Sequence, residues 1–338
     1  MTAVRIAILG FWHVHAKDFI REAREARQDP EVEIVAGWDP DEAFGREQAA
    51  AFGLPFEPDL GALLARADLD GAIVTTGTTR HVPVIAAALR AGKHVLSEKV
   101  LAPTRAEAAA LAALAGETGR VLHVSLFRRA HGSTRAIREA LAGGAPGAPT
   151  HARVRVAHDG AVAGPDRPGG WLPARFYDAS ASGGGATIDL GAHPLYLLHD
   201  FLGMPSEVLS VYGRVTGRGV EDHSIVTLRY PNDVLATAET GFVSAGPFTS
   251  IEINGTRGNL HLCPADGALR VRAEPGGSWQ TVALPDDGPS PFRRWLGLLP
   301  GAAADVETLD AAVALSALAE AANRSAAEGR PVRVRDLA

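Results

Sequence analysis

The chain has little cysteine and no long apolar run. Its one cysteine, Cys263, excludes an intrachain disulfide and fits a reducing compartment. Because Cys263 lies in an apolar stretch, we expect it to be a small core residue. The first apolar run, residues 6–9, is too short for the core of a secretory signal, and no run approaches the roughly 18 apolar residues of a membrane helix. We therefore expect a cytoplasmic protein with no membrane partner.

Positive charge is not in excess. The 33 Lys and Arg residues are outnumbered by 39 Asp and Glu residues, which gives a formal net charge of −6. A general nucleic-acid partner would require a basic face, so we expect none. With 46% hydrophobic residues, the 338-residue chain can bury a sizeable core, and its length favours two domains.

Short apolar strands alternate with helices in the first third of the chain. The pattern predicts strands at 4–9, 33–38, 71–75 and 94–97. It predicts helices at 15–27, 82–91 and 105–116, and a further helix that follows the second strand and runs through residue 51. Thr104 and Glu107 have the spacing of a capping box before the last of these helices, and Gly119 lies beyond its end. The repeated strand–helix order predicts a doubly wound parallel sheet of the Rossmann type.

The pattern changes near residue 150. Polar and apolar residues alternate at 151–157, 207–216, 223–230, 234–243, 250–254, 259–263 and 268–273, with helices expected near 190–202 and 306–327. This predicts an α+β domain with a large, mostly antiparallel open sheet. We divide the chain into a dinucleotide-binding domain at 1–125 and a substrate and oligomerisation domain at 126–338, with 143–149 as the junction loop.

The loop after the first strand lacks two glycines of the dinucleotide fingerprint G-x-G-x-x-G. Gly10 keeps the first position, but Trp12 and His15 occupy the other two. A strand, a glycine turn and a helix N-terminus still form an anion site through free N–H groups and the helix dipole. Asp39, at the end of the second strand, can accept hydrogen bonds from ribose hydroxyls and would repel a 2′-phosphate, which favours NAD over NADP. Alternatively, Asp39 is a plain helix N-cap before Pro40.

His13 and His15 raise the alternative of a metal site in the same loop. Two histidines two residues apart need further ligands, and in a loop such residues more often bond the backbone or face solvent. We therefore expect no metal.

Two further stretches carry polar residues suited to catalysis. The stretch A-G-K-H-V-L-S-E-K at 91–99 is a buried strand that ends in Glu98 and Lys99. The stretch S-G-G-G-A-T-I-D-L-G-A-H at 182–193 places Asp189 and His193 four residues apart, on one face if the segment is helical. A lysine at the carboxyl end of a parallel strand points into the crevice where such sheets bind ligands.

With these residues the sequence resembles the glucose–fructose oxidoreductase / inositol dehydrogenase (Gfo/Idh/MocA) family. The resemblance covers the opening strand, residues 70–99, the D-x-G-x-H segment and INGTRGNLHL at 253–262. It implies a Rossmann domain followed by an α/β domain whose open sheet often forms an oligomer interface, hence a homodimer or homotetramer. It also implies hydride transfer between NAD(P) and a secondary alcohol or ketone of a sugar, cyclitol or related polyol. A redox-neutral lyase or epimerase with tightly bound NAD, and a non-catalytic NAD-binding sensor, stay open.

By this resemblance, Lys99, Asp189 and His193 match the family's catalytic trio. For alcohol oxidation His193 is the natural base, since an imidazole has an ordinary pKa near 6.5. Lys99 would stabilise charge on the same oxygen, and Asp189 would orient His193 or hold a substrate hydroxyl. The cofactor site is expected to comprise Gly10, Phe11, Trp12, His13, Val14, Asp39, Thr76, Gly77, Thr78, His81, Glu98 and Lys99. Substrate contacts are expected from Lys99, Arg128, Trp171, Tyr177 and His193.

Some residues depart from the family's pattern. Val100 follows the Glu–Lys pair where a proline is usual, and Gly77 replaces another common proline. Tyr196 stands where many members have an aspartate. Pro194 follows His193 directly, so the helix there must begin late or kink.

Overall fold

The structure is a computed structural model that describes residues 3–26, 31–246, 248–301 and 304–337. The chain forms two compact units, and each is built from two stretches. The first unit contains Met1–Ser125 and Pro289–Val313, and the second contains Leu126–Gly288 and Ala314–Ala338.

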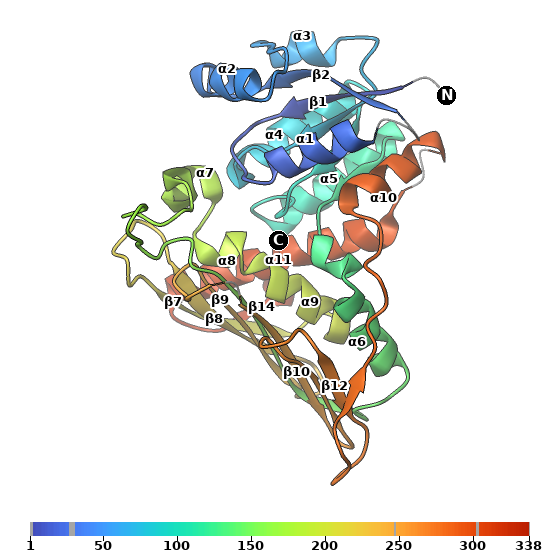
Figure 1. Cartoon of the computed structure of the whole chain (residues 1–338), viewed down its shortest axis with the longest axis vertical. Coiled ribbons are helices and arrows are strands. Elements are labelled where there is room, and N and C mark those ends of the chain that lie inside the picture. Colours follow the sequence, from blue (N-terminus) through green and yellow to red (C-terminus); the bar gives the residue numbers. More distant parts are fainter. Residues whose placement is uncertain (1–2, 27–30, 247, 302–303, 338) are drawn as a thin grey trace. The chain divides into compact units, whose positions relative to one another are not determined.

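The first unit contains a five-stranded sheet in the order β2-β1-β3-β4-β5, and every neighbouring pair is parallel. Figure 1 labels β1 and β2 of this sheet and the helices α1 to α5 around it. The strands are β1 (Val4–Leu9), β2 (Val32–Trp38), β3 (Gly71–Val74), β4 (His94–Ser97) and β5 (Leu122–Val124). The predicted Rossmann-type sheet is therefore confirmed. β5 is three residues long, and its range was not predicted, because so short a run carries no measurable periodicity.

Helices connect these strands. They are α1 (Ala16–Glu25), α2 (Glu42–Ala51), α3 (Leu60–Leu64), α4 (His81–Arg90) and α5 (Arg105–Thr118), with a 3₁₀ turn η1 at Thr78–Arg80. The expected end of the first helix at Arg27 lies outside the described residues. The capping box of α5 is confirmed, since Thr104 and Glu107 bond each other's backbone N–H groups, and Gly119 ends the helix with a φ of +61°.

The first unit also includes α10 (Pro291–Leu298), which corrects the predicted division at 126–338. Phe292, Trp295 and Leu296 are buried in the same apolar cluster as Ile6 and Ile8 of β1. A helix with three large apolar side chains on one face packs where that face becomes buried. The position of the helix in the sequence does not decide this. The expected junction loop at 143–149 is also wrong, because it lies inside the second unit, between α6 (Gly132–Ala142) and β6 (Pro149–Ala157).

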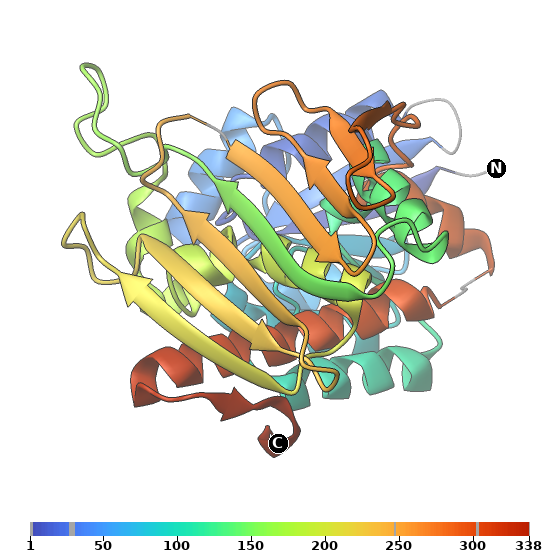
Figure 2. The same ribbon diagram turned by 90° about the horizontal axis from the view of Figure 1, so that it is seen from below.

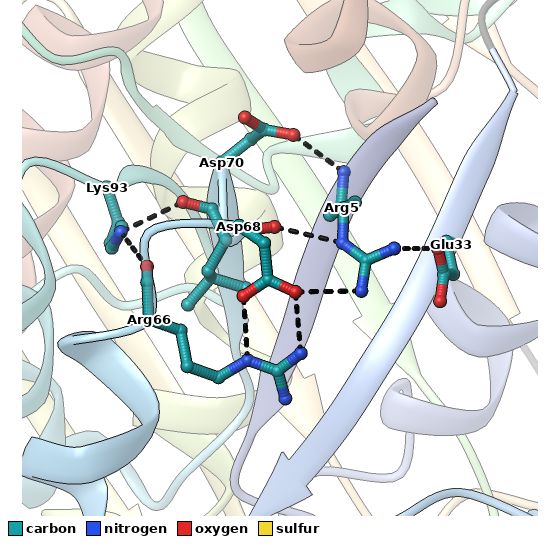
Figure 3. A network of polar contacts seen from close by, with 7 residues as sticks. Arg5, Glu33, Arg66, Asp68, Asp70 and Lys93 are labelled. Atoms are coloured by element: carbon teal, nitrogen blue, oxygen red, sulfur yellow. Dashed lines mark hydrogen bonds and ion pairs between the residues drawn. The ribbon is translucent and has the colours of Figure 1, made fainter. Parts of the chain in front are cut away.

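An ionic network holds the amino ends of the central strands (Figure 3). Arg5 of β1 forms ion pairs with Glu33 of β2 and with Asp68, and its backbone N–H donates to Asp70 at 2.8 Å. Lys93 donates to two backbone carbonyls of the segment before β3, at 2.7 and 2.9 Å. The charged side chains at this end of the sheet are thus satisfied by one another and by backbone carbonyls, whereas the candidate site residues follow the opposite, carboxyl ends.

The second unit contains a nine-stranded sheet in the order β13-β12-β11-β10-β6-β9-β8-β7-β14 (Figure 2). Besides β6, its strands are β7 (Glu207–Gly213), β8 (His223–Arg229), β9 (Leu235–Gly241), β10 (Phe248–Gly255), β11 (Asn259–Leu262), β12 (Leu269–Arg272), β13 (Gln280–Val282) and β14 (Val332–Arg333). Every pair is antiparallel except β6 with β9, so the predicted mostly antiparallel sheet is confirmed. β7 ends earlier than predicted because the carboxylate of Asp222 accepts the N–H groups of Val215 and Thr216.

The remaining helices lie before β6, between β6 and β7, or after β13 in the sequence. They are α7 (Ala179–Ser182), α8 (Ala186–Asp189), α9 (Ala192–Leu202) and α11 (Val306–Glu328), with 3₁₀ turns η2 (Phe127–Ala130), η3 (Ala174–Tyr177), η4 (Leu299–Gly301) and η5 (Val334–Asp336). α9 begins two residues before Pro194, so this proline lies in the first turn, where its missing N–H costs nothing.

The sequence also raised the burial of Cys263 and the presence of a membrane helix. Cys263 is half-buried at the turn after β11, so the expectation of a core residue is wrong. Among the described residues, no helix is both long and apolar enough to cross a membrane.

Candidate active site

The candidate residues of the first unit follow the carboxyl ends of neighbouring parallel strands. Such ends share one edge of the sheet, and ligands of open α/β sheets bind there. The residues that follow β1, β2, β3 and β4 are Gly10, Asp39, Thr75, Thr76, Glu98 and Lys99.

Gly10 makes the tight turn after β1. Its φ is +92°, and a Cβ at this position would lie 2.5 Å from the methyl carbon of Thr76. The Gly10 N–H donates to the carbonyl of Trp38 at 2.6 Å, and the hydroxyl of Thr75 donates to the Gly10 carbonyl. Only glycine fits this turn, which is held from both neighbouring strands.

The carboxylate of Asp39 joins the end of β2 to the glycine loop. Its Oδ2 accepts the Phe11 N–H at 2.7 Å, and its Oδ1 accepts the Asp41 N–H at 2.9 Å. Asp41, whose carboxylate accepts the N–H of Phe44, is the N-cap of α2. Asp39 is therefore not the helix cap that the sequence left open. The side chain of Phe11 packs in the core, so Phe11 offers a ligand only its backbone.

A backbone N–H and a hydroxyl near the start of α1 are not used in hydrogen bonds within the described residues. Among the described residues, the N–H of Val14 has no hydrogen-bond acceptor, and the buried hydroxyl of Thr76 has no partner. His15 occupies the N-cap position of α1 without a side-chain bond to the helix. An anion is stabilised by N–H groups at such a helix end. The loop therefore fits a phosphate group even with Trp12 in place of the second glycine.

His13 and His15 meet Glu98 at this edge. Nδ1 of His15 lies 3.1 Å from Oε1 of Glu98, and Nδ1 of His13 accepts the His15 N–H at 3.2 Å. One potential ligand atom from each of the three side chains lies within 4.8 Å of the others. Burial favours the neutral acid of Glu98, but His13, His15 and Lys99 outweigh it and lower the pKa of Glu98 to about 2. A buried carboxylate is thus held ionised.

Lys99 is buried directly after Glu98. Its exposed fraction is 3%, and its N–H donates to Oε2 of Glu98 at 3.2 Å. The peptide bond between Lys99 and Val100 is cis.

His81 supports the surrounding loops from inside. It is almost fully buried, its Nδ1 lies 2.7 Å from the Val100 carbonyl oxygen, and its Nε2 lies 3.2 Å from that of Thr76. Burial outweighs these carbonyl contacts and lowers the pKa of His81 to about 4. Of the other predicted cofactor residues on this loop, Gly77 precedes η1 in extended conformation and Thr78 is buried in its first turn.

In the second unit, His193 lies in the first turn of α9 and is 3% exposed. Its Nδ1 lies 3.0 Å from the hydroxyl of Tyr196, which accepts the backbone N–H of Arg128 at 3.1 Å. The ring of Phe127 packs edge-on to His193, with 5.0 Å between centroids. The structure thus brings the predicted substrate residues Arg128 and His193 together around Tyr196.

The guanidinium of Arg128 retains unused donor capacity. One of its nitrogens donates to Thr249 at 3.4 Å, and its carbon lies 5.3 Å from the centre of the Phe127 ring. Its buried Nε has no hydrogen-bond partner among the described residues. Buried donors without partners are rare and point to a missing acceptor such as a ligand oxygen.

Asp189 and His193 do not lie on one continuous helix. Asp189 ends α8, and α9 begins at Ala192 after two residues that keep helical dihedral angles. Nδ1 of His193 faces Tyr196, which sequence reasoning noted as a departure from the family's pattern but gave no role. The spacing of three residues between His193 and Tyr196 could have signalled this contact, since it places both on one helix face.

Trp171 and Tyr177 belong to another cluster of the second unit. The indole N–H of Trp171 donates to Asp159 at 2.8 Å, and its ring lies 4.8 Å from that of His158. The guanidinium of Arg218 covers the Tyr177 ring at 3.8 Å. These contacts give both aromatic side chains a structural explanation.

The chain is similar to known oxidoreductases in both sequence and structure. Residues 4–126 match the model described as oxidoreductase family, NAD-binding Rossmann fold, and residues 134–261 match the GFO/IDH/MocA C-terminal domain. A dTDP-3,4-didehydro-2,6-dideoxy-alpha-D-glucose 3-reductase of Streptomyces antibioticus is 33% identical over 69% of this chain and 68% of its own length. A 1,5-anhydro-D-fructose reductase of Ensifer adhaerens is 34% identical over 59% of this chain, and the match spans 58% of that reductase, less than two thirds of it. The solved structure of GenD2 from gentamicin A biosynthesis, in complex with NAD, is 25% identical, covers 98% of this chain and 97% of its own, and has a TM-score of 0.78.

Proposed function

The chain belongs to the Gfo/Idh/MocA family of oxidoreductases, and we propose that it is an NAD-dependent enzyme that interconverts a ketone and a secondary alcohol on a sugar, cyclitol or related polyol. The observation that carries this proposal is the meeting of the Gly10 turn, Asp39 and the Glu98–Lys99 pair at one edge of a parallel sheet. The relatives from Streptomyces antibioticus and Ensifer adhaerens are reductases, which does not favour the lyase, epimerase or sensor alternatives.

The residues at this edge suit NAD. The start of α1 and the Val14 N–H would hold the pyrophosphate, and Asp39 would accept the hydroxyls of the adenosine ribose. The negative charge of Asp39 opposes a 2′-phosphate, which favours NAD over NADP. When bound, the nicotinamide supplies or takes up the hydride.

The chain's own residues act on the substrate oxygen and on the rest of the sugar. Lys99 would stabilise negative charge on the reacting oxygen, and His193 would contact the same oxygen. Arg128 would donate to a further substrate oxygen through the Nε that lacks a protein partner. Asp189 would accept a substrate hydroxyl.

The proposed reaction does not require a metal. Although His13, His15 and Glu98 offer three ligand-type atoms, Nδ1 of His13 accepts a backbone N–H, and Nδ1 of His15 bonds Oε1 of Glu98. We expect dialysis against EDTA to leave NADH binding unchanged; a loss of binding that Zn²⁺ restores would refute the metal-free site.

A nucleotide titration followed by a turnover assay tests the proposed function. NADH and NADPH are titrated against intrinsic fluorescence, because Trp12 and Trp38 lie in or next to the glycine loop. Turnover is then measured with 1,5-anhydro-D-fructose and a panel of keto-sugars and cyclitol ketones. We expect tighter binding of NADH and NADH oxidation with at least one ketone. Failure of both nucleotides to bind would refute the proposal.

A further inference from the structure

We propose that Tyr196 is a positioning residue that holds His193 in its neutral Nε2–H tautomer, so that His193 serves the reaction as a hydrogen-bond donor and not as a base. The role in the reaction rests on the proposed function. The tautomer follows from two contacts within the second unit.

The direction of each hydrogen bond around Tyr196 follows from what its partners can do. The backbone nitrogen of Arg128 carries a hydrogen and only donates, so the phenol oxygen accepts this bond at 3.1 Å. The phenol hydrogen then needs an acceptor, and Tyr196 is fully buried. Among the described residues, the other polar atom at hydrogen-bond distance from the phenol oxygen is Nδ1 of His193, at 3.0 Å. Because an unpaired buried hydroxyl is unfavourable, Tyr196 donates and Nδ1 accepts.

This arrangement opposes the imidazolium form of His193. An imidazolium carries hydrogens on both nitrogens, so its Nδ1–H would compete with the phenol hydrogen. Burial raises the pKa of Tyr196 above its ordinary value, so the phenol keeps its hydrogen. The charged groups that act on the Tyr196 hydroxyl are Arg128, whose guanidinium lies over the adjoining Phe127 ring, and the Arg129–Asp200 ion pair. The Phe127 ring that Arg128 covers also packs edge-on to the imidazole, so the pair has a positive charge in its surroundings.

A carboxylate at position 196 would have the opposite effect. Carboxylates only accept, so an aspartate here would hold the hydrogen on Nδ1 and leave the Nε2 lone pair free to act as a base. Tyr196 has the opposite effect. Because its oxygen already accepts the Arg128 N–H, its hydroxyl donates to Nδ1 of His193, and the imidazole hydrogen lies on Nε2.

The donor role changes the source of the proton in ketone reduction. The carbonyl carbon gains the hydride with its electron pair, and the oxygen gains a proton from an ammonium group, for which Lys99 is the candidate; that ammonium becomes an amine. His193 keeps its Nε2–H and donates a hydrogen bond to the oxygen throughout, because losing this hydrogen would create an imidazolate. In alcohol oxidation the same transfers run backwards, and the amine accepts the proton.

Nitrogen-15 NMR of the full-length protein tests the tautomer directly. Long-range ¹H–¹⁵N correlations of histidine-labelled protein, recorded above the titration range of histidine, distinguish a protonated ring nitrogen from an unprotonated one. The signals of His193 are assigned by their loss in His193→Gln. His223 provides an internal reference of opposite polarity, since its Nδ1 lies 2.7 Å from a carboxylate oxygen of Asp222, which can only accept.

We expect an unprotonated Nδ1 and a protonated Nε2 for His193, and the reverse for His223. In Tyr196→Phe we expect the Nδ1-protonated form of His193 to appear while the His223 pattern is unchanged, with near-UV circular dichroism verifying the fold. A protonated Nδ1 in the wild type, or an unaltered His193 pattern in a folded Tyr196→Phe variant, would overturn the proposal. If that variant does not fold, the wild-type spectrum decides alone. Because this readout needs neither nucleotide nor substrate, its failure is distinct from failure of the proposed function.

Discussion

Oδ2 of Asp39 lies 2.7 Å from the backbone nitrogen of Phe11, so one carboxylate at the end of β2 holds the loop that follows β1. The same carboxylate therefore supplies the negative charge of the proposed nucleotide site and fixes the backbone of the glycine loop. Each oxygen of a carboxylate has two lone pairs, so these bonds leave Asp39 able to accept ribose hydroxyls.

Replacing Asp39 tests its proposed role in choosing the nucleotide. In Asp39→Ser we expect weaker NADH binding and a preference for NADH over NADPH that falls by about tenfold or more, which corresponds to about 1.4 kcal/mol. The dissociation constants of both nucleotides are measured by fluorescence titration. Asp41→Ser is the matched control, because this exposed N-cap keeps its capping chemistry. An unchanged preference in Asp39→Ser would contradict the assignment.

Removing the ammonium of Lys99 tests the catalytic assignment. In Lys99→Met we expect kcat with NADH and the best ketone of the panel to fall by about 10²–10⁴-fold, as for loss of a general acid. The Kd of NADH should change far less, and both values are measured on the same preparation. Lys17→Met, on the exposed face of α1, is the control for losing one positive charge. Full turnover in Lys99→Met would remove this residue from the mechanism.

Two substitutions of His193 separate a hydrogen-bond donor from a proton carrier. A glutamine amide donates a hydrogen bond but does not titrate, whereas alanine does neither. We expect His193→Gln to keep kcat within about tenfold of the wild type and His193→Ala to lose about 10²–10³-fold, the range for a lost oxyanion donor. Steady-state rates over a range of pH provide the measurement. Equal inactivity of two folded variants would show that His193 carries the proton.

Stability should depend on pH through His81. Its folded pKa of about 4 lies below the ordinary 6.5, so the unfolded chain binds the proton more readily between these values. The stabilisation is present above pH 6.5 and is lost as the pH falls through 4, by at most about 3 kcal/mol. Denaturant unfolding should show a smaller loss across this window in His81→Gln than in the wild type. His151→Gln, at an exposed histidine of β6, should behave like the wild type, and identical pH profiles for all three proteins would disprove the role of His81.

The large sheet carries exposed apolar side chains suited to the expected homo-oligomer. They include Leu209 and Val211 of β7, Ile225 of β8 and Leu235 of β9. Val211 is 68% exposed, and we expect Val211→Asp to shift the protein to a smaller species in light scattering coupled to size exclusion. Val306→Asp changes a similarly exposed valine at the start of α11 and should leave the mass unchanged. A wild-type monomer would refute the oligomer.

Local periodicity was sufficient to predict most strands and helices, because each pattern is contained in its own segment. It could not show where α10 packs, since Phe292 and Trp295 contact a core built from β1 and α1. The long-range contacts of Glu98 and Tyr196 were equally hidden. Glu98 meets His15 across 83 residues, and Tyr196 meets Arg128 across 68. Such contacts arise from the fold and leave no mark on neighbouring residues.

The two-part make-up of the first unit has a consequence for its synthesis. The aromatic face of α10 closes the core beneath β1, yet the ribosome adds this helix only after β13. The first unit therefore cannot complete its core while its strands leave the ribosome. Its nascent form exposes apolar surface until the large sheet of the second unit has been synthesised. A fragment that ends at Ser125 would stay in that unfinished state, so an isolated cofactor-binding unit must include Pro289–Val313.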